Sequence, residues 1–179
     1  MGKLQYTKLV IGELVNDIGP GPMNTFSAVG DVSGNGNDAV VHGGASLDAG
    51  RFGQAYRYDG VDDFLEVADS ETLDSVMTDG MSVSVWAKFD GIPENIDYRY
   101  TWGIVAKWGP GMHGDDSYLI WGSWEGRLGC NVGDGATNVG AETQIGFIQT
   151  DTWYHIVVTW DKDGGAKLYV NSELVDVRT

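Results

Sequence analysis

Short runs of alternating apolar and polar residues recur along this chain, and such runs are typical of β-strands that bury one face. The clearest run covers residues 81–89, where every second residue from Met81 to Phe89 is apolar and Trp86 lies on the other face with polar neighbours. Similar runs predict strands at residues 39–42, 64–67, 103–107, 117–121 and 127–132. With about ten to twelve such strands, the chain is expected to form an all-β sandwich or barrel.

Residues 151–175 predict a β-hairpin that lies at the centre of the fold. Alternate residues from Tyr154 to Trp160 are apolar, and Leu168 and Val170 continue the pattern after an Asp-Gly turn at residues 161–165. The opposite face of the first strand also carries large side chains, so we expect this strand in the interior of a two-layer sandwich.

Two further segments of the chain contain turns rich in aspartate. Residues 31–38 show no apolar periodicity and are expected to form a structured polar loop. Residues 55–58 and 64–67 flank an Asp-Gly turn at 59–63, which predicts a second hairpin.

The composition limits the classes of function. The chain has 179 residues, enough for one domain with a sizeable core, and its 27 glycines fit many short strands and turns. Its 26 acidic and 11 basic residues give a net charge of −15, which argues against nucleic-acid and anionic-membrane partners. The acidity serves solubility, or some of the carboxylates bind a hard cation. No apolar run predicts membrane insertion, and the single cysteine, Cys130, is expected to be buried.

Four stretches together carry a family resemblance: residues 31–37, 50–67, 81–88 and 152–171. In their order and spacing they resemble the laminin-G-like, concanavalin A-like jelly-roll domains of bacterial and phage surface proteins. The resemblance implies an all-β fold with two antiparallel sheets, a jelly-roll sandwich over residues 31–179. Residues 1–30 are then an N-terminal strand segment or arm.

The end of the chain departs from this family pattern. The family usually continues past the final hairpin with an Ile-Gly strand and a closing strand, whereas this chain stops at Thr179. Either the chain is a fragment, or the missing position is filled by another segment: the N-terminal strand, whose residues 8–12 look like that Ile-Gly strand, or a neighbouring subunit. A vacant position would favour a homo-oligomer formed by exchange of the N-terminal strand.

A calcium site is expected near the polar loop. Asp31, Ser33 and Asn35 place oxygen ligands at alternate residues beside a glycine, as calcium loops do, and Asn37 extends the series. His42 occupies the position where an EF-hand has glutamate, so carboxylates from the second turn would complete the shell: Asp59, Asp62 and Asp63. The resemblance also implies calcium here. Alternatively, these side chains only hydrogen-bond their own backbone.

Tryptophans suggest a glycan partner, because flat aromatic faces stack on the apolar faces of sugars. The candidate binding residues are Trp102, Trp108, Trp124 and Trp86, while Trp121 is expected in the core. Alternatively, two or three of them are core residues. From the family pattern, Trp153 and His155 are interpreted as structural.

A non-catalytic carbohydrate-binding or adhesion module with structural calcium is therefore the first expectation. No pair of carboxylates has the alternating spacing that β-glucan-cleaving relatives use, so an enzyme is not expected. The alternative is a structural subunit of a virion or surface filament. Either function places the protein outside the cell, on a cell surface or in a virion.

Overall fold

The computed structural model describes residues 7–10, 28–74, 80–92, 101–107, 117–133, 138–161 and 163–178. These residues form antiparallel strands and one helix of four residues, α1 (Glu71–Asp74). No helix in these ranges is long and apolar enough to cross a membrane.

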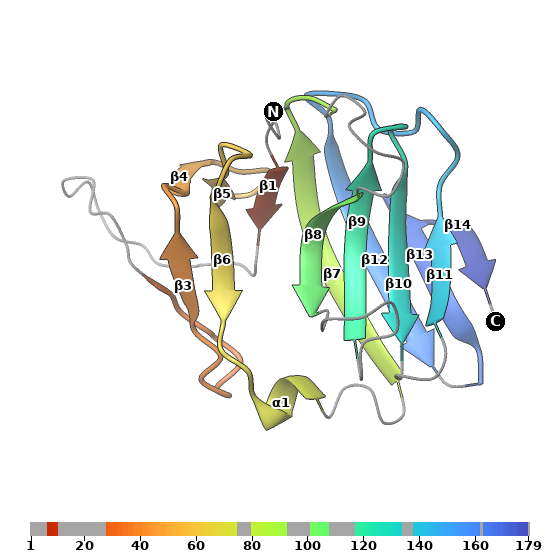
Figure 1. Cartoon of the computed structure of the whole chain (residues 1–179), viewed down its shortest axis with the longest axis horizontal. Helices are drawn as coiled ribbons and strands as arrows, with labels where there is room; N and C mark the ends of the chain where they lie inside the picture. The colour runs from red at the N-terminus through yellow and green to blue at the C-terminus, as the bar shows by residue number, and fades with distance from the viewer. Residues whose placement is uncertain are drawn as a thin grey trace.

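The larger layer is a seven-stranded antiparallel sheet, at the back in Figure 1. Its strands, in spatial order, are β14 (Glu173–Arg178), β13 (Gly165–Val170), β12 (Trp153–Asp161), β7 (Gly80–Phe89), β1 (Thr7–Val10), β5 (Gln54–Arg57) and β4 (Ser46–Ala49). The hairpin of β12 and β13 forms as predicted, and β12 lies in the sheet interior between β13 and β7.

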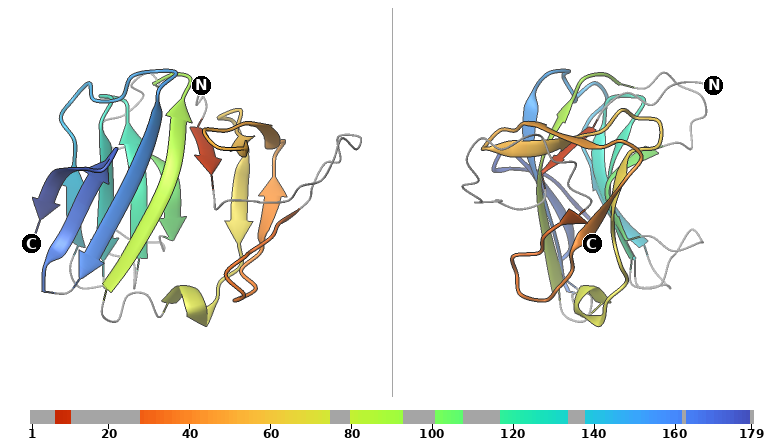
Figure 2. Two further views of the ribbon diagram at one scale, coloured as in Figure 1. Left: turned by 180° about the vertical axis from the view of Figure 1, so that it is seen from behind. Right: turned by 90° about the vertical axis from the view of Figure 1, so that its left-hand side faces the viewer.

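Two smaller sheets face this layer, as the two views of Figure 2 show from behind and from the side. One contains β11 (Asn138–Glu142), β10 (Leu128–Gly133), β9 (Ser117–Ser123) and β8 (Thr101–Lys107). The other contains β2 (Ala28–Val29), β3 (Ala39–His42) and β6 (Phe64–Val67). The two-layer, all-β sandwich expected from the sequence is thereby confirmed.

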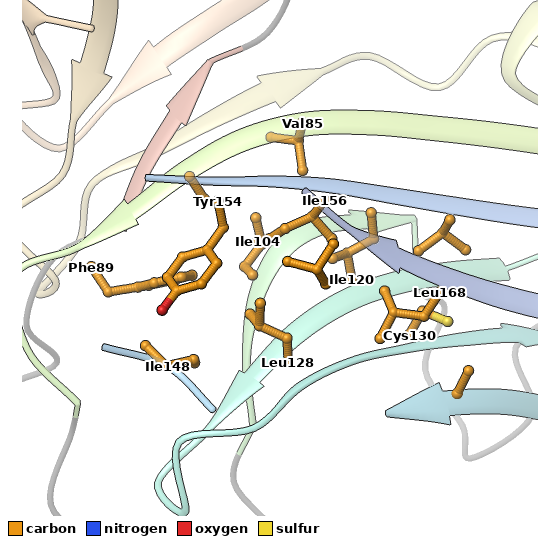
Figure 3. Close-up of a cluster of buried hydrophobic side chains, with 14 of the residues drawn as sticks. Val85, Phe89, Ile104, Ile120, Leu128, Cys130, Ile148, Tyr154, Ile156 and Leu168 are labelled. Atoms are coloured by element: carbon orange, nitrogen blue, oxygen red, sulfur yellow. The ribbon is translucent and has the colours of Figure 1, made fainter. Parts of the chain in front are cut away.

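The core fills the space between the layers (Figure 3). Phe89, Ile156 and Leu168 from the large sheet are fully buried and face Ile120 and Leu128 of the four-stranded sheet. In their strands, these apolar residues alternate with polar or outward-facing residues. The period-two pattern of the sequence therefore predicted the core correctly. Cys130 is buried here as expected, and burial raises the pKa of its thiol to about 11.

The N-terminal strand lies inside the large sheet of the same chain. Leu9 of β1 is the register partner of Ala87 on one side and of Tyr56 on the other. Of the alternatives left open by the sequence, the structure therefore shows the N-terminal strand in the sheet, and no exchange with a neighbour is needed to fill this position.

The predicted hairpin of residues 55–67 is wrong. β5 pairs with β4 and β1 in the large sheet, whereas β6 pairs with β3 in the three-stranded sheet. The turn at 59–63 crosses between layers because its Asp63 carboxylate accepts hydrogen bonds from the backbone of both Asp59 and Gly44. The neighbour that precedes β5 in the chain is β4, a strand that was not predicted because only two alternating apolar residues, Leu47 and Ala49, mark it.

Beyond the predicted final hairpin, the chain forms one more strand. β14 pairs with β13 at the edge of the large sheet after a turn at Asn171 and Ser172, which have φ values of 52° and 71°. The chain thus provides its own edge strand after the hairpin, where the sequence suggested that the closing strands of the family were missing.

Candidate functional site

The outer face of the seven-stranded sheet carries the candidate site. Val85 and Ala87 of β7 and Tyr154 and Ile156 of β12 point into the core, so the residues between them point outward. Trp86 lies between the first pair and His155 between the second, and the two are direct cross-strand partners. An aromatic pair therefore lies side by side on the surface away from the core.

Four side chains build an aromatic surface that we call the Trp86 platform: Arg51, Phe52, Trp86 and His155. The rings of Trp86 and His155 stack with centroids 4.9 Å apart and planes inclined by 14°. Phe52 meets Trp86 edge to face at 5.4 Å and is 62% exposed. The guanidinium carbon of Arg51 lies 5.0 Å from the Phe52 ring centroid and 5.7 Å from that of Trp86.

The turn between β4 and β5 supplies Arg51 and Phe52 to this platform. Gly50 N donates to Gly53 O at 2.9 Å and closes the turn around the two residues. Gly53 has a φ of +57°, a conformation that glycine adopts without steric cost. A tight turn thus presents a cation and an aromatic ring together, although neither belongs to a strand.

Polar contacts fix the orientation of His155. Its Nε2 lies 2.8 Å from the hydroxyl of Ser84. Its backbone N–H donates to Asn171 Oδ1 at 3.0 Å, and the Asn171 N–H donates to its carbonyl at 2.8 Å. Ser84 thus holds the ring and Asn171 holds the backbone, so the position of His155 beside Trp86 is fixed.

An exposed, ordered aromatic surface with a polar border has the chemistry of a sugar-binding site, because aromatic faces contact the C–H faces of pyranose rings and hydrogen-bonding groups orient the hydroxyls. Ser84, Asn171 and Arg51 lie on or beside the platform and provide such groups.

Comparison with known proteins agrees with this architecture. A family model described as the concanavalin A-like lectin/glucanases superfamily matches residues 59–179. The chain belongs to this superfamily. Among solved structures, it resembles the binding domain of Paraclostridial Mosquitocidal Protein 1, with a TM-score of 0.66 and 17% sequence identity. The match covers 99% of this chain but only 40% of the other chain. At this low sequence identity, the likeness shows a shared fold. No curated protein matches the sequence significantly.

Within this superfamily fold, the four candidate tryptophans do not form one cluster. Trp86 lies on the outer face described above, whereas Trp102 packs against the core over Gly122. Trp124 is half-buried in the turn between β9 and β10, and Trp108 lies outside the described residues. Trp121, expected in the core, is buried, but it lies on the other side of β9 from Ile120, on the outer face of the four-stranded sheet.

The candidate metal ligands fall into two groups at opposite ends of β3. The loop at 31–38 precedes Ala39, whereas the Asp63 carboxylate binds the backbone just after His42. Four strand residues at about 3.3 Å each separate the groups by about 13 Å. The structure does not join them into a single shell.

Within the loop, hydrogen bonds already engage Asp31. Its carboxylate accepts the N–H of Asn37 at 2.9 Å and of Ser33 at 2.7 Å, and also the Ser33 hydroxyl at 2.8 Å. Asn37 in turn hydrogen-bonds Thr72 beyond the loop. This arrangement fits the backbone-capping alternative. The other group, Asp59, Asp62 and Asp63, brings carboxylate oxygens within 4.8 Å of one another.

Replacing Asp31 with alanine is expected to lower the melting temperature by a few degrees, equally in EDTA and in calcium, because the lost contacts are to the loop itself. Hydrogen bonds from Asn37 and Ser33 hold the pKa of Asp31 below its ordinary value. Its stabilisation is therefore present above the unfolded-state pKa and is lost as the pH falls through the folded-state pKa.

Thermal melts between pH 2 and 7 check this prediction. Asp163→Ala is the control, since this exposed carboxylate has no hydrogen bond or ion pair within the described ranges. A destabilisation by Asp31→Ala that appears only when calcium is present would show that the residue acts as a metal ligand instead.

Sequence reasoning missed three members of the Trp86 platform. His155 was interpreted as structural, and Arg51 and Phe52 were read only as part of the family motif at residues 50–67. The sequence did contain one signal for Arg51 and Phe52. They stand between two glycines, and such a sequence forms a turn that exposes both side chains.

Proposed function

We propose that this protein is a non-catalytic carbohydrate-binding module whose Trp86 platform receives the sugar. The observation that carries the proposal is the geometry of Phe52, which is 62% exposed and yet held edge-on against Trp86. Single exposed hydrophobic side chains are common on protein surfaces, whereas an exposed ring held against a second ring and a cation offers a rigid stacking surface at low entropic cost. The superfamily assignment supports the same class of ligand.

The groups around the platform favour binding over catalysis. Retaining and inverting glycosidases need two carboxylates flanking the scissile bond. In the part of the chain that the structure describes, the rings of the platform contact each other, Arg51 and Ser84, and no carboxylate is among these partners.

Replacing Phe52 with alanine is expected to weaken glycan binding about tenfold or more, equivalent to about 1.4 kcal/mol, because the exposed part of the stacking surface is removed. Binding of the full chain to a printed glycan array, followed by calorimetry on the best ligand, measures the effect. Circular dichroism spectra should be unchanged.

The matched control is Phe64→Ala. Phe64 is 50% exposed and stacks on His42 at 4.4 Å, but it belongs to the three-stranded sheet. This variant should bind like the wild type. Equal losses in both variants, or an array without any bound glycan, would contradict the proposal.

The proposal also includes a calcium site and a location for the protein. We propose that calcium binds at the turn of Asp59, Asp62 and Asp63, because their carboxylate oxygens lie within 4.8 Å of one another and suit a hard cation. A glycan-binding role places the module outside the cell, on a cell surface or on a virion.

The alternative of a filament or virion subunit has less support, because β1 completes the sheet from within the chain.

A further inference from the structure

We infer that the ligand of the Trp86 platform carries a carboxylate, as a uronic acid residue does, and that Arg51 binds it. This inference rests on the proposed function and adds the chemical class of the sugar. Its evidence is the distribution of ion pairs, the position of the Arg51 guanidinium and the net charge of the chain.

Arg51 differs from every other cation whose side chain the structure describes. The other six all lie within 4.0 Å of a carboxylate oxygen: Arg57, Lys88, Lys107, Arg127, Lys167 and Arg178. Arg51 has no such partner among the described residues, although acidic residues outnumber basic ones by 26 to 11. A surface rich in carboxylates has thus left one arginine unpaired, and that arginine lies on the Trp86 platform.

The neighbouring cations illustrate the contrast. Lys88 lies on the same outer face, two residues from Trp86, but its Nζ is 4.0 Å from Asp90 and 3.9 Å from Asp151. Arg57 lies 3.1 Å from Asp90 and 3.6 Å from Asp48. The charges of both are compensated, so Arg51 is the one cation available to a ligand at this site among those whose side chains the structure describes.

The contacts of Arg51 leave its hydrogen-bonding groups free. Its guanidinium carbon lies over the rings of Phe52 and Trp86, and this cation–π contact uses the charge of the group rather than its N–H donors. A guanidinium so placed can offer a planar fork of N–H groups to a carboxylate. A sugar ring stacked on the platform would bring a carboxylate at C6 to this fork.

The net charge of −15 narrows the ligand further. A uniformly anionic polysaccharide is repelled by the field of the whole protein, whereas a single carboxylate within a neutral glycan gains the short-range contact at little long-range cost. The inferred ligand is therefore a largely neutral glycan that carries an isolated uronic acid.

Oligosaccharides containing one glucuronic acid residue, compared with the same oligosaccharides after carboxyl reduction to glucose, test this inference. The wild-type chain should bind the acidic form about tenfold more tightly, and Arg51→Gln should remove this preference, so that the variant binds the acidic and the reduced forms with equal affinity. Arg51→Lys, which keeps the charge but not the fork, should retain part of the preference. Arg57→Gln is the control and should retain all of it.

The outcomes separate the two proposals. Equal wild-type affinity for both forms, or a preference that survives Arg51→Gln, would overturn the role of Arg51 and leave glycan binding standing. Failure to bind any neutral or acidic glycan would overturn the proposed function itself.

Discussion

Replacing Phe89 with alanine should lower the free energy of unfolding by about 3–5 kcal/mol, which is the usual cost of removing a phenylalanine from a closed core. Phe89 is 0% exposed, lies between the two layers and has its ring centroid 6.1 Å from that of Tyr154. Its backbone pairs with Thr7 of β1, and its carbonyl accepts the N–H of Asp151 at 2.8 Å, so the surroundings cannot collapse easily into the cavity.

Urea titration followed by circular dichroism measures this loss, and Phe52→Ala is the matched control. The control removes the same side chain from a position that is 62% exposed, so it should change stability by no more than about 0.5 kcal/mol. The two substitutions should therefore separate folding from binding, since Phe89→Ala mainly affects the first and Phe52→Ala the second. Comparable destabilisation by both would mean that Phe52 belongs to the core.

The core was predictable because it depends on local periodicity. In β7 and β12 the backbone alternates regularly, and the apolar positions predicted from residues 81–89 and 153–160 are the ones that face the four-stranded sheet. The regular alternation of the strand is interrupted in β8, where the register shifts between Gly103 and Val105. Trp102 lies before this shift and shares the core face with Ile104 by plain alternation, although the sequence suggested a residue at the rim.

Strand pairing was less predictable, because it depends on residues far apart in the sequence. An Asp-Gly turn such as 59–63 looks the same whether it joins two paired strands or crosses between layers. Asp63 binds backbone groups at Asp59 and at Gly44, and the second of these contacts spans 19 residues. No local pattern contains that information.

The candidate site was likewise predictable where it depends on local alternation and not where it depends on contacts between distant residues. The outward orientation of Trp86 followed from alternation, but its neighbours Phe52 and His155 come from distant strands and turns. The loop at 31–38 shows a further limit, since oxygen side chains at alternate positions suit both a metal shell and a capped turn. The hydrogen bonds that Asp31 accepts fit the capped turn.

The outer face of the four-stranded sheet depends on a glycine. A Cβ atom added at Gly129 would lie 2.2 Å from the ring of Trp121, which donates from Nε1 to Asn131 Oδ1 at 2.7 Å. Gly129→Ala must therefore displace a buried indole and break its hydrogen bond. We expect a loss of about 1–3 kcal/mol in the free energy of unfolding, together with a red shift in tryptophan emission as the ring becomes exposed.

Gly103→Ala is the control for this prediction, since Gly103 is the cross-strand partner of Trp121 in β8 of the same sheet. A Cβ atom there would meet only Ala106 and Leu119, at ordinary contact distances of 3.7 Å. That variant should be neutral or slightly stabilising, because alanine reduces the entropy of the unfolded chain. If Gly129→Ala were equally neutral, the indole would have room to move, and close packing over Gly129 would not be what orders this face.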